Sequence, residues 1–283
     1  MTVGGVAVGG LTPDAATTTV QDAFQAEVEL DLGTTHIFVT PDLLGAKAAV
    51  EVAIAQAATA PADTQIPLAV AVEQPVTAGF VAKLAKRLDR KAVDSQLLLR
   101  RSRPYITRDR PGRRLDQRKT VRDVVAALTA NRREPIRLLA KAVKPKVTRA
   151  SYHAIIVIHR GLNRLYLYRG MRFWRLFGVA TGQTQYPTPL GRFRIVVKWK
   201  NPWWYPPASP WAKGQKPIPP GPGNPLGTRW MGLSASGVGI HGTPSDGSIG
   251  YSVSHGCIRM HIPEAEWLFN HVDVGTTVFI VPH

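Results

Sequence analysis

The 283-residue chain contains one cysteine, Cys257, and no long apolar run. A single thiol cannot form an intrachain disulfide, so either packing or chemistry must account for it. No uninterrupted apolar stretch approaches the roughly 20 residues that span a bilayer. The segment Met1–Gly10 also lacks the charged start and apolar core of a signal peptide. With a hydrophobic fraction of 44%, the composition favours a globular protein long enough for two domains.

Acidic side chains are scarce in the middle of the chain. Residues 83–149 hold 22 basic and 6 acidic side chains, whereas residues 1–82 hold one basic residue and nine acidic ones. A basic segment can contact nucleic acid, anionic lipid or an anionic wall polymer, and it can equally be a solvated face. No zinc-finger spacing, recognition-helix pattern or aromatic RNA-binding motif accompanies the charge, so no nucleic-acid partner is expected.

Residues 1–148 are predicted to form an α+β domain. A cap residue, a proline and an acid at Thr12-Pro13-Asp14 predict a helix that runs to about Glu27. The other predicted elements are strands at Val28–Leu30, His36–Val39, Leu68–Val72 and Tyr105–Thr107, helices over Ala46–Ala60, Val76–Leu88 and Val121–Ala130, and a turn at Pro111-Gly112. None of these elements carries convergent catalytic side chains, so a binding or spacer domain is expected.

Residues 149–283 are predicted to form a mainly antiparallel β-sandwich or barrel-like domain. The predicted strands are Ala154–Ile158, Arg164–Tyr168, Phe173–Ala180, Arg192–Trp199, Trp230–Leu233, Val238–His241 and Thr277–Val281, and Pro263–His271 is a predicted helix. A loop over residues 200–228 interrupts the strands. Its Asn201–Thr228 portion holds nine prolines, four glycines and three tryptophans. Prolines exclude regular structure and the aromatics argue against a disordered tether, so we expect an ordered lid.

The chemistry concentrates around Cys257. Free cysteine is often only a small buried hydrophobe. Here, however, Ile240-His241-Gly242-Thr243 and Ser254-His255-Gly256-Cys257-Ile258-Arg259-Met260 place two histidines near it in sequence, which favours a nucleophile. The N–H groups of Gly256 and Cys257 are candidate donors for an oxyanion. Spacing alone leaves both His241 and His255 open as the base.

Two other kinds of site fit less well. His241, His255, Cys257 and His261 are four potential zinc ligands, but they lack the paired short spacings of structural zinc sites, so no metal is expected. A serine hydrolase is disfavoured because the chain has no Gly-x-Ser-x-Gly elbow.

The His241 and Cys257 motifs resemble the active-site motif of the L,D-transpeptidase (YkuD-type) catalytic domain. Three further segments are similar to the same family: Thr181-Gly182, Tyr186–Phe193 and Pro222–Thr228. The resemblance covers roughly Tyr152 to Pro282. The opening Val6–Ala16 is similar, more loosely, to peptidoglycan-binding domains that precede this catalytic domain.

The resemblance implies a role for each site residue. It assigns the nucleophile to Cys257, the base to His241 and the carbonyl that orients the base to Gly242. His255, Gly256 and Cys257 would shape the oxyanion hole and donor site. Ser254 would bind substrate, and Arg259 would organise the site or engage a substrate carboxylate. Tyr186 and Trp230 would line the substrate groove, although core packing explains aromatic residues equally well.

The resemblance also implies acyl transfer between peptidoglycan stem peptides without a cofactor. A cysteine thioester would form with release of D-alanine from a tetrapeptide donor. β-Lactams of the carbapenem class would then be covalent inhibitors, and anionic wall polymers would be possible contacts of the basic segment. Such substrates imply an extracytoplasmic location, with a native anchor or signal missing from this chain. An L,D-carboxypeptidase of the same fold and a non-catalytic wall-binding protein are the alternatives.

Overall fold

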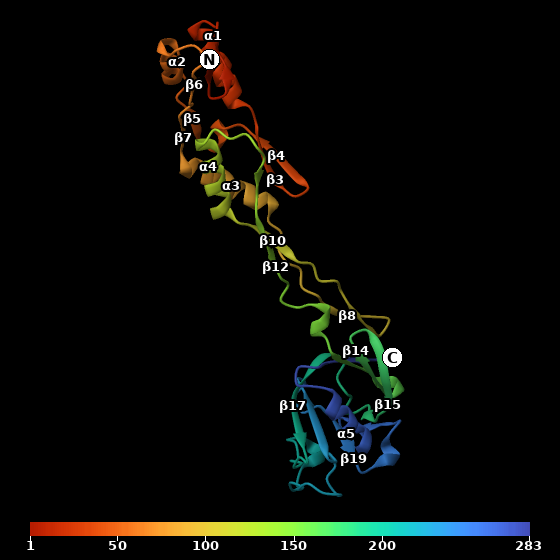
Figure 1. Ribbon diagram of the computed structural model, residues 1–283. Helices are drawn as coiled ribbons and strands as arrows, with labels where there is room; N and C mark the ends of the chain where they lie inside the picture. Colours follow the sequence, from red (N-terminus) through yellow and green to blue (C-terminus); the bar gives the residue numbers. More distant parts are fainter. The chain divides into compact units, whose positions relative to one another are not determined.

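The computed structural model describes residues 1–283, which divide into two compact units (Figure 1). Unit 1 comprises Met1–Val93 and Arg110–Pro145, and unit 2 comprises Asp94–Asp109 and Lys146–His283. The longer part of unit 2 begins at Lys146, close to the predicted domain boundary at residue 148. The chain also contributes the earlier segment Asp94–Asp109 to unit 2, which the sequence does not predict. No helix has the length and apolar character needed to cross a membrane.

Unit 1 mixes helices with short strands, as predicted for its fold class. Its helices are α1 (Pro13–Gln25), α2 (Val50–Thr59), α3 (Gln74–Leu88) and α4 (Gln117–Thr129). Its strands are β1 (Thr2–Val3), β2 (Val6–Ala7), β3 (Val28–Leu32), β4 (Thr35–Val39), β5 (Ala46–Ala48), β6 (Gln65–Ile66), β7 (Val70–Val72), β10 (Gly112–Leu115), β11 (Ile136–Arg137) and β12 (Ala140–Val143). Helix α1 begins as predicted, because the Thr12 hydroxyl accepts the Ala15 N–H and Pro13 occupies the first turn. Fully buried Val20, Leu30 and Val124 belong to one apolar core.

Two predictions in unit 1 are wrong. The alanine-rich stretch Ala46–Ala60 was expected to be one helix, but its first three residues form β5, which pairs with β7. Strand pairing at that point overrides the high intrinsic helix propensity of alanine. Pro111-Gly112 was expected to be a turn, but Gly112 begins β10. A Cβ atom there would lie 2.3 Å from the Arg90 carbonyl oxygen, so glycine permits the close approach of two backbones.

Unit 2 is mostly β-structure. Its strands are β8 (Leu97–Arg100), β9 (Arg103–Ile106), β13 (Ala154–His159), β14 (Arg164–Arg169), β15 (Arg172–Gly178), β16 (Thr181–Gly182), β17 (Gly191–Lys200), β18 (Arg229–Leu233), β19 (Gly239–Thr243), β20 (Ser252–Ser254), β21 (Ile258–His261) and β22 (Thr277–Val281). Its α-helix is α5 (Ile262–His271), one residue longer than predicted.

Eight strands of unit 2 form one sheet in the order β15-β14-β13-β22-β17-β18-β19-β21. The β13–β22 and β19–β21 pairings are parallel and the others are antiparallel. The mainly antiparallel, barrel-like fold expected for this domain is therefore confirmed. Helix α5 packs against β18, β19 and β21 (Figure 1).

The two faces of this sheet have different cores. Ile156, Ile158 and Leu165 point to one side, into the core that α5 also closes. Ile155 and Val157 point to the other side, where Leu97 and Ile106 of the β8–β9 hairpin cover them. The segment 94–109 thus covers this face of the eight-stranded sheet, which explains why it belongs to unit 2.

The segment Asn201–Thr228 connects β17 to β18 and folds on itself. Trp204 and Ile218 exchange two backbone hydrogen bonds of 2.9 Å. The buried Asn224 amide donates to the carbonyls of Pro202, Ile218 and Pro219 at 2.8–3.2 Å. We call this segment the proline-tryptophan loop; its internal bonding matches the expectation of an ordered loop.

Candidate functional site

The parallel pairing of β19 with β21 brings the two sequence motifs together. Ile240 pairs with Ile258, and both are fully buried in the core. Side chains alternate along a strand, so His241 and Arg259, which also pair, project from the opposite face. Cys257 directly precedes β21, next to the start of β19. The sheet therefore places His241, Cys257 and Arg259 in one region of unit 2.

His241 is held in a defined tautomer. Its ring is 4% exposed, and Nδ1 lies 2.6 Å from the Gly242 carbonyl oxygen. Because a carbonyl can only accept, Nδ1 carries the proton and Nε2 has its lone pair free. Burial lowers the pKa of His241 to about 4; the bond to Gly242 opposes this shift, and the positive charge of Arg259 adds to it. The imidazole is consequently neutral at pH 7.

Cys257 keeps part of its exposure, but the surrounding protein still desolvates the sulfur. Burial raises the pKa of the Cys257 thiol above its usual value, while a hydrogen bond from the Gly239 backbone and the charge of Arg259 oppose the shift. The thiol lies 3.5 Å from the Gly237 carbonyl oxygen, to which it donates. At rest the sulfur is therefore a neutral thiol that is hydrogen-bonded to the backbone of the β18–β19 connection, rather than a thiolate paired with an imidazolium.

A tight turn joins β20 to Cys257. The Ser254 hydroxyl donates to the Cys257 carbonyl at 2.6 Å and accepts the Gly256 N–H at 3.1 Å. Gly256 has φ +113°, a conformation that side-chain-bearing residues rarely adopt. In the structure Ser254 therefore shapes the turn. The Gly256 N–H, one of the two expected oxyanion donors, is already engaged, which leaves the Cys257 N–H as the candidate.

Thr188 links this turn by hydrogen bonds to a neighbouring segment of the same polypeptide. It is fully buried, and its hydroxyl donates to the Gly256 carbonyl at 3.0 Å and accepts the Gly182 N–H at 2.7 Å. The peptide group between Gly256 and Cys257 is thus fixed from outside the turn. Sequence reasoning did not single out Thr188; its only signal was its place inside the family-like segment Tyr186–Phe193.

His255 lies in a different environment from His241. The residue is exposed, and its ring stacks on Trp211 of the proline-tryptophan loop, with centroids 3.9 Å apart and an interplanar angle of 11°. The Tyr186 ring is tilted against the His255 ring, with their centroids 5.2 Å apart. Of the two candidate bases, only His241 has a ring nitrogen oriented by a backbone carbonyl. The role of Trp211 could not be seen in the sequence, because three tryptophans of the loop were equivalent there.

Trp230 packs beside His241. The two residues are cross-strand partners on β18 and β19, and their rings stack with centroids 5.7 Å apart. A Cβ atom on Gly239 would come within 2.4 Å of the Trp230 ring, so the indole occupies space that a side chain on β19 would fill. The proline-tryptophan loop also contacts strand β19 next to His241, because Gly227 packs against the backbone of Gly242.

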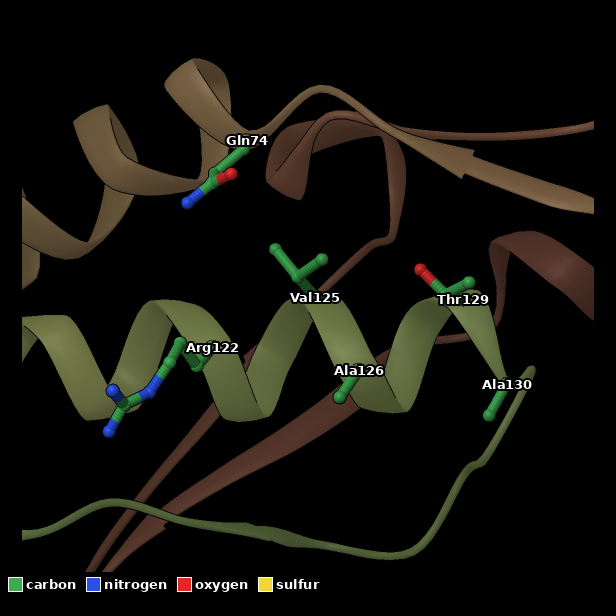
Figure 2. Close-up of a pocket in the computed structure, with 6 residues that line it drawn as sticks. All are labelled: Gln74, Arg122, Val125, Ala126, Thr129 and Ala130. Atoms are coloured by element: carbon green, nitrogen blue, oxygen red, sulfur yellow. The ribbon is translucent and has the colours of Figure 1, made fainter.

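No group of three or more His, Cys, Asp or Glu side chains is arranged to hold a metal ion. His261, one of the four potential ligands considered from the sequence, lies 2.7 Å from Asp246 instead. In unit 1, a hollow of about 430 Å³ lies between α3 and α4, where Gln74 and Val125 face each other (Figure 2). It is lined by Gln74, Arg122, Val125, Ala126, Thr129 and Ala130 and contains no nucleophile or base. The candidate nucleophile and both candidate bases therefore lie in unit 2.

Comparisons with known proteins agree with this location. Residues 153–280 match the family model described as the L,D-transpeptidase catalytic domain, and residues 40–137 match that of a putative peptidoglycan binding domain. "Putative L,D-transpeptidase YqjB" of Bacillus subtilis is 39% identical over 131 residues, which are 44% of this chain and 69% of that protein. "Probable L,D-transpeptidase ErfK/SrfK" of Salmonella typhimurium is 37% identical over 44% of this chain and 43% of its own length. Among solved structures, the Enterococcus faecium L,D-transpeptidase C442S mutant aligns over 95% of this chain and all of its own, with 14% identity and a TM-score of 0.40.

Proposed function

Because the chain belongs to the L,D-transpeptidase family, we propose that it cross-links peptidoglycan stem peptides through a thioester on Cys257. The observation that carries this proposal is the orientation of His241, whose Nδ1 donates to the Gly242 carbonyl and whose Nε2 lone pair is free, on a strand that pairs with the one Cys257 precedes. A neutral, oriented imidazole next to a thiol is the arrangement that nucleophilic acyl transfer needs.

In the first half-reaction, the Cys257 sulfur attacks the carbonyl of the L-centre of the third residue in a donor tetrapeptide. His241 Nε2 takes the thiol proton as the carbon–sulfur bond forms, because the raised pKa of the thiol leaves little thiolate at rest. The carbonyl oxygen gains negative charge, which the Cys257 N–H stabilises. The carbon–nitrogen bond then breaks, and the imidazolium protonates the departing D-alanine.

In the second half-reaction, a side-chain amine of another stem peptide attacks the thioester. His241 Nε2 removes the amine proton and returns a proton to the sulfur as the thiol leaves. Water attacking in place of the amine would give hydrolysis, so the balance of the two products depends on solvent exclusion. The stack of Trp211 on His255 supports a role of the proline-tryptophan loop in that exclusion.

Arg259 and the two aromatic residues receive supporting roles. The positive charge of Arg259 acts on Cys257 and on both histidines, which fits a residue that favours anionic sulfur and holds a substrate carboxylate. Tyr186 and Trp230 flank His255 and His241 and would line the groove. Peptidoglycan as substrate implies an extracytoplasmic place of action, and residues 40–137 would bind the same polymer.

The test is incubation with a disaccharide tetrapeptide and analysis by mass spectrometry. A cross-linked dimer with loss of D-alanine is expected, and Cys257→Ala should abolish it without changing the fold. A tripeptide alone would identify a carboxypeptidase, and an unchanged substrate with an intact fold would contradict both activities. His261→Ala is the matched control for His241→Ala, because His261 pairs with Asp246 rather than with the site.

A carbapenem offers a second probe of the same sulfur. Its strained amide carbonyl is open to attack by Cys257, and we expect one covalent adduct per chain in the intact mass. The adduct should be absent from Cys257→Ala.

A further inference from the structure

A second hollow lies in unit 2 and shares no lining residue with the Cys257 site. It has a volume of about 590 Å³ and lies between the tip of the β8–β9 hairpin and strands β13, β14 and β15. This volume is in the range of small-molecule sites. Nothing in the proposed acyl transfer uses it.

Aromatic side chains form one wall of the hollow. Tyr166 and Tyr168 alternate along β14 with the core residues Leu165 and Leu167, so they project from the outer face of the sheet. Phe173 of β15 meets both tyrosines edge to face, with centroids 6.3 and 6.0 Å apart. Phe173 is 52% exposed, so its ring is accessible from the hollow.

Tyr168 brings an unpartnered polar group to this wall. Its side chain is only 6% exposed, yet its hydroxyl makes no hydrogen bond with the protein. The hydroxyl of Tyr166 has no protein partner either. Neither hydroxyl oxygen is enclosed away from solvent, so both phenols are free to bond the hydroxyl or amide groups of a ligand in the hollow.

The opposite wall carries two free positive charges. Arg101 and Arg103 line the hollow, and neither guanidinium makes an ion pair, a hydrogen bond or an aromatic stack. Burial raises the pKa of Tyr168 and the charge of Arg103 opposes that shift, so this guanidinium lies near the phenol. No Asp or Glu lines the hollow, which therefore favours an anion.

The turn that presents these arginines is strained. Arg101 and Ser102 both have positive φ, 48° and 57°, in a two-residue hairpin turn where asparagine and glycine are preferred. The Ser102 hydroxyl holds the turn by donating to the main-chain carboxylate oxygen of His283 at 3.1 Å. Turn chemistry does not explain an arginine at such a position, whereas strain of this kind is frequent at ligand-binding sites.

We propose that this hollow binds an anionic sugar unit of a cell-wall polymer. The sugar ring would lie on Phe173 and the two tyrosines, with its hydroxyls bonded to the free phenols. Its phosphate or carboxylate would bridge Arg101 and Arg103, because guanidinium groups pair with both anions in bidentate geometry. The site would hold the glycan next to the enzyme without taking part in the chemistry at Cys257.

Calorimetric titration of the full-length protein tests the proposal. The ligands are N-acetylglucosamine 1-phosphate and glucuronate, with N-acetylglucosamine and inorganic phosphate as controls. The variants are Arg101→Asn with Arg103→Gln, and Phe173→Ala; asparagine tolerates positive φ, so the turn should survive. Arg108→Ala is the matched control, because Arg108 is an exposed arginine of the same segment that does not line the hollow.

We expect at least one of the two sugar acids to bind, and the tighter one identifies the anion. Affinity should fall about tenfold or more in the double arginine variant and in Phe173→Ala, and remain unchanged in Arg108→Ala. Absence of binding at millimolar concentration, equal binding of the neutral sugar or of inorganic phosphate, or insensitivity to the arginines would each overturn the proposal. Circular dichroism checks that the variants fold. Titration of the Cys257→Ala protein should give the same affinity, so this result is separate from the outcome for transpeptidation.

Discussion

The indole of Trp211 lies flat on the imidazole of His255, with ring centroids 3.9 Å apart. This contact joins the proline-tryptophan loop to the residue that lies two positions before the nucleophile. The loop therefore contacts the site through this aromatic stack as well as through Gly227.

Removing that stack should change which acceptor resolves the thioester. In Trp211→Ala we expect more hydrolysis relative to cross-linking, because water gains access to the acyl enzyme. The ratio of tripeptide to cross-linked dimer measures this. Trp203→Ala serves as control, since Trp203 is 49% exposed and stacks on Tyr205 rather than on His255. An equal ratio in the two variants would argue against the loop as a solvent barrier.

Asn224 offers a second way to loosen the same loop. Its amide bonds three carbonyls of the loop, so Asn224→Ala removes these bonds and leaves the buried Pro202 carbonyl unpaired, at about 1–3 kcal/mol. Proteolytic cleavage within residues 201–228 should become faster. Gln215→Ala removes a single exposed bond to Trp211 and should leave the cleavage rate unchanged.

The protonation of His241 predicts the pH dependence of activity. The base must be neutral, so kcat/KM should rise as the pH increases through about 4 and then stay level to neutral pH. A rise centred near 6.5 would mean that the imidazole is not desolvated in the working enzyme. His241→Gln should lose the activity throughout this range.

The same imidazole links stability to pH. Its pKa is about 4 when folded and about 6.5 when unfolded, so the unfolded chain binds more protons between these values. The free energy of unfolding of unit 2 should therefore fall by about 3 kcal/mol as the pH decreases from 7 to 4. Tryptophan fluorescence follows this unit alone, because all seven tryptophans belong to it. His241→Gln should show a shallower slope.

Thr188 should behave as a positioning residue. Thr188→Val keeps the shape but removes the bond that fixes the Gly256 carbonyl, and with it the direction of the Cys257 N–H. We expect acylation by substrate to slow about tenfold or more. Alkylation of Cys257 by iodoacetamide, which needs no oxyanion donor, should change little.

Thr188→Ser keeps the hydroxyl and should restore most of the acylation rate. A similar loss in the serine and valine variants would indicate packing rather than orientation.

The sequence predicted the β-rich catalytic fold and both motifs of the site, because alternating apolar residues and glycine-flanked histidines are local signals. Spacing alone left both histidines open as the base, and only the family resemblance assigned that role to His241 and its orientation to the Gly242 carbonyl; the structure has this bond between the two neighbouring residues. The stack of His255 on Trp211 was not predicted, because it depends on a tertiary contact. Thr188 stayed hidden for the same reason, as its partner Gly256 is 68 residues away. The β5 segment was missed because its alanines have high helix propensity, whereas its pairing with β7 is a tertiary contact.

The β8–β9 hairpin has a practical consequence for anyone who isolates the catalytic part. Residues 153–280 match the catalytic family model, but Leu97 and Ile106 lie outside that range and shield Ile155 and Val157. A fragment that begins at residue 149 would lack the hairpin, so it would expose this apolar face of the sheet to water and tend to aggregate. Supplying the missing hairpin as a separate peptide would be expected to restore its solubility.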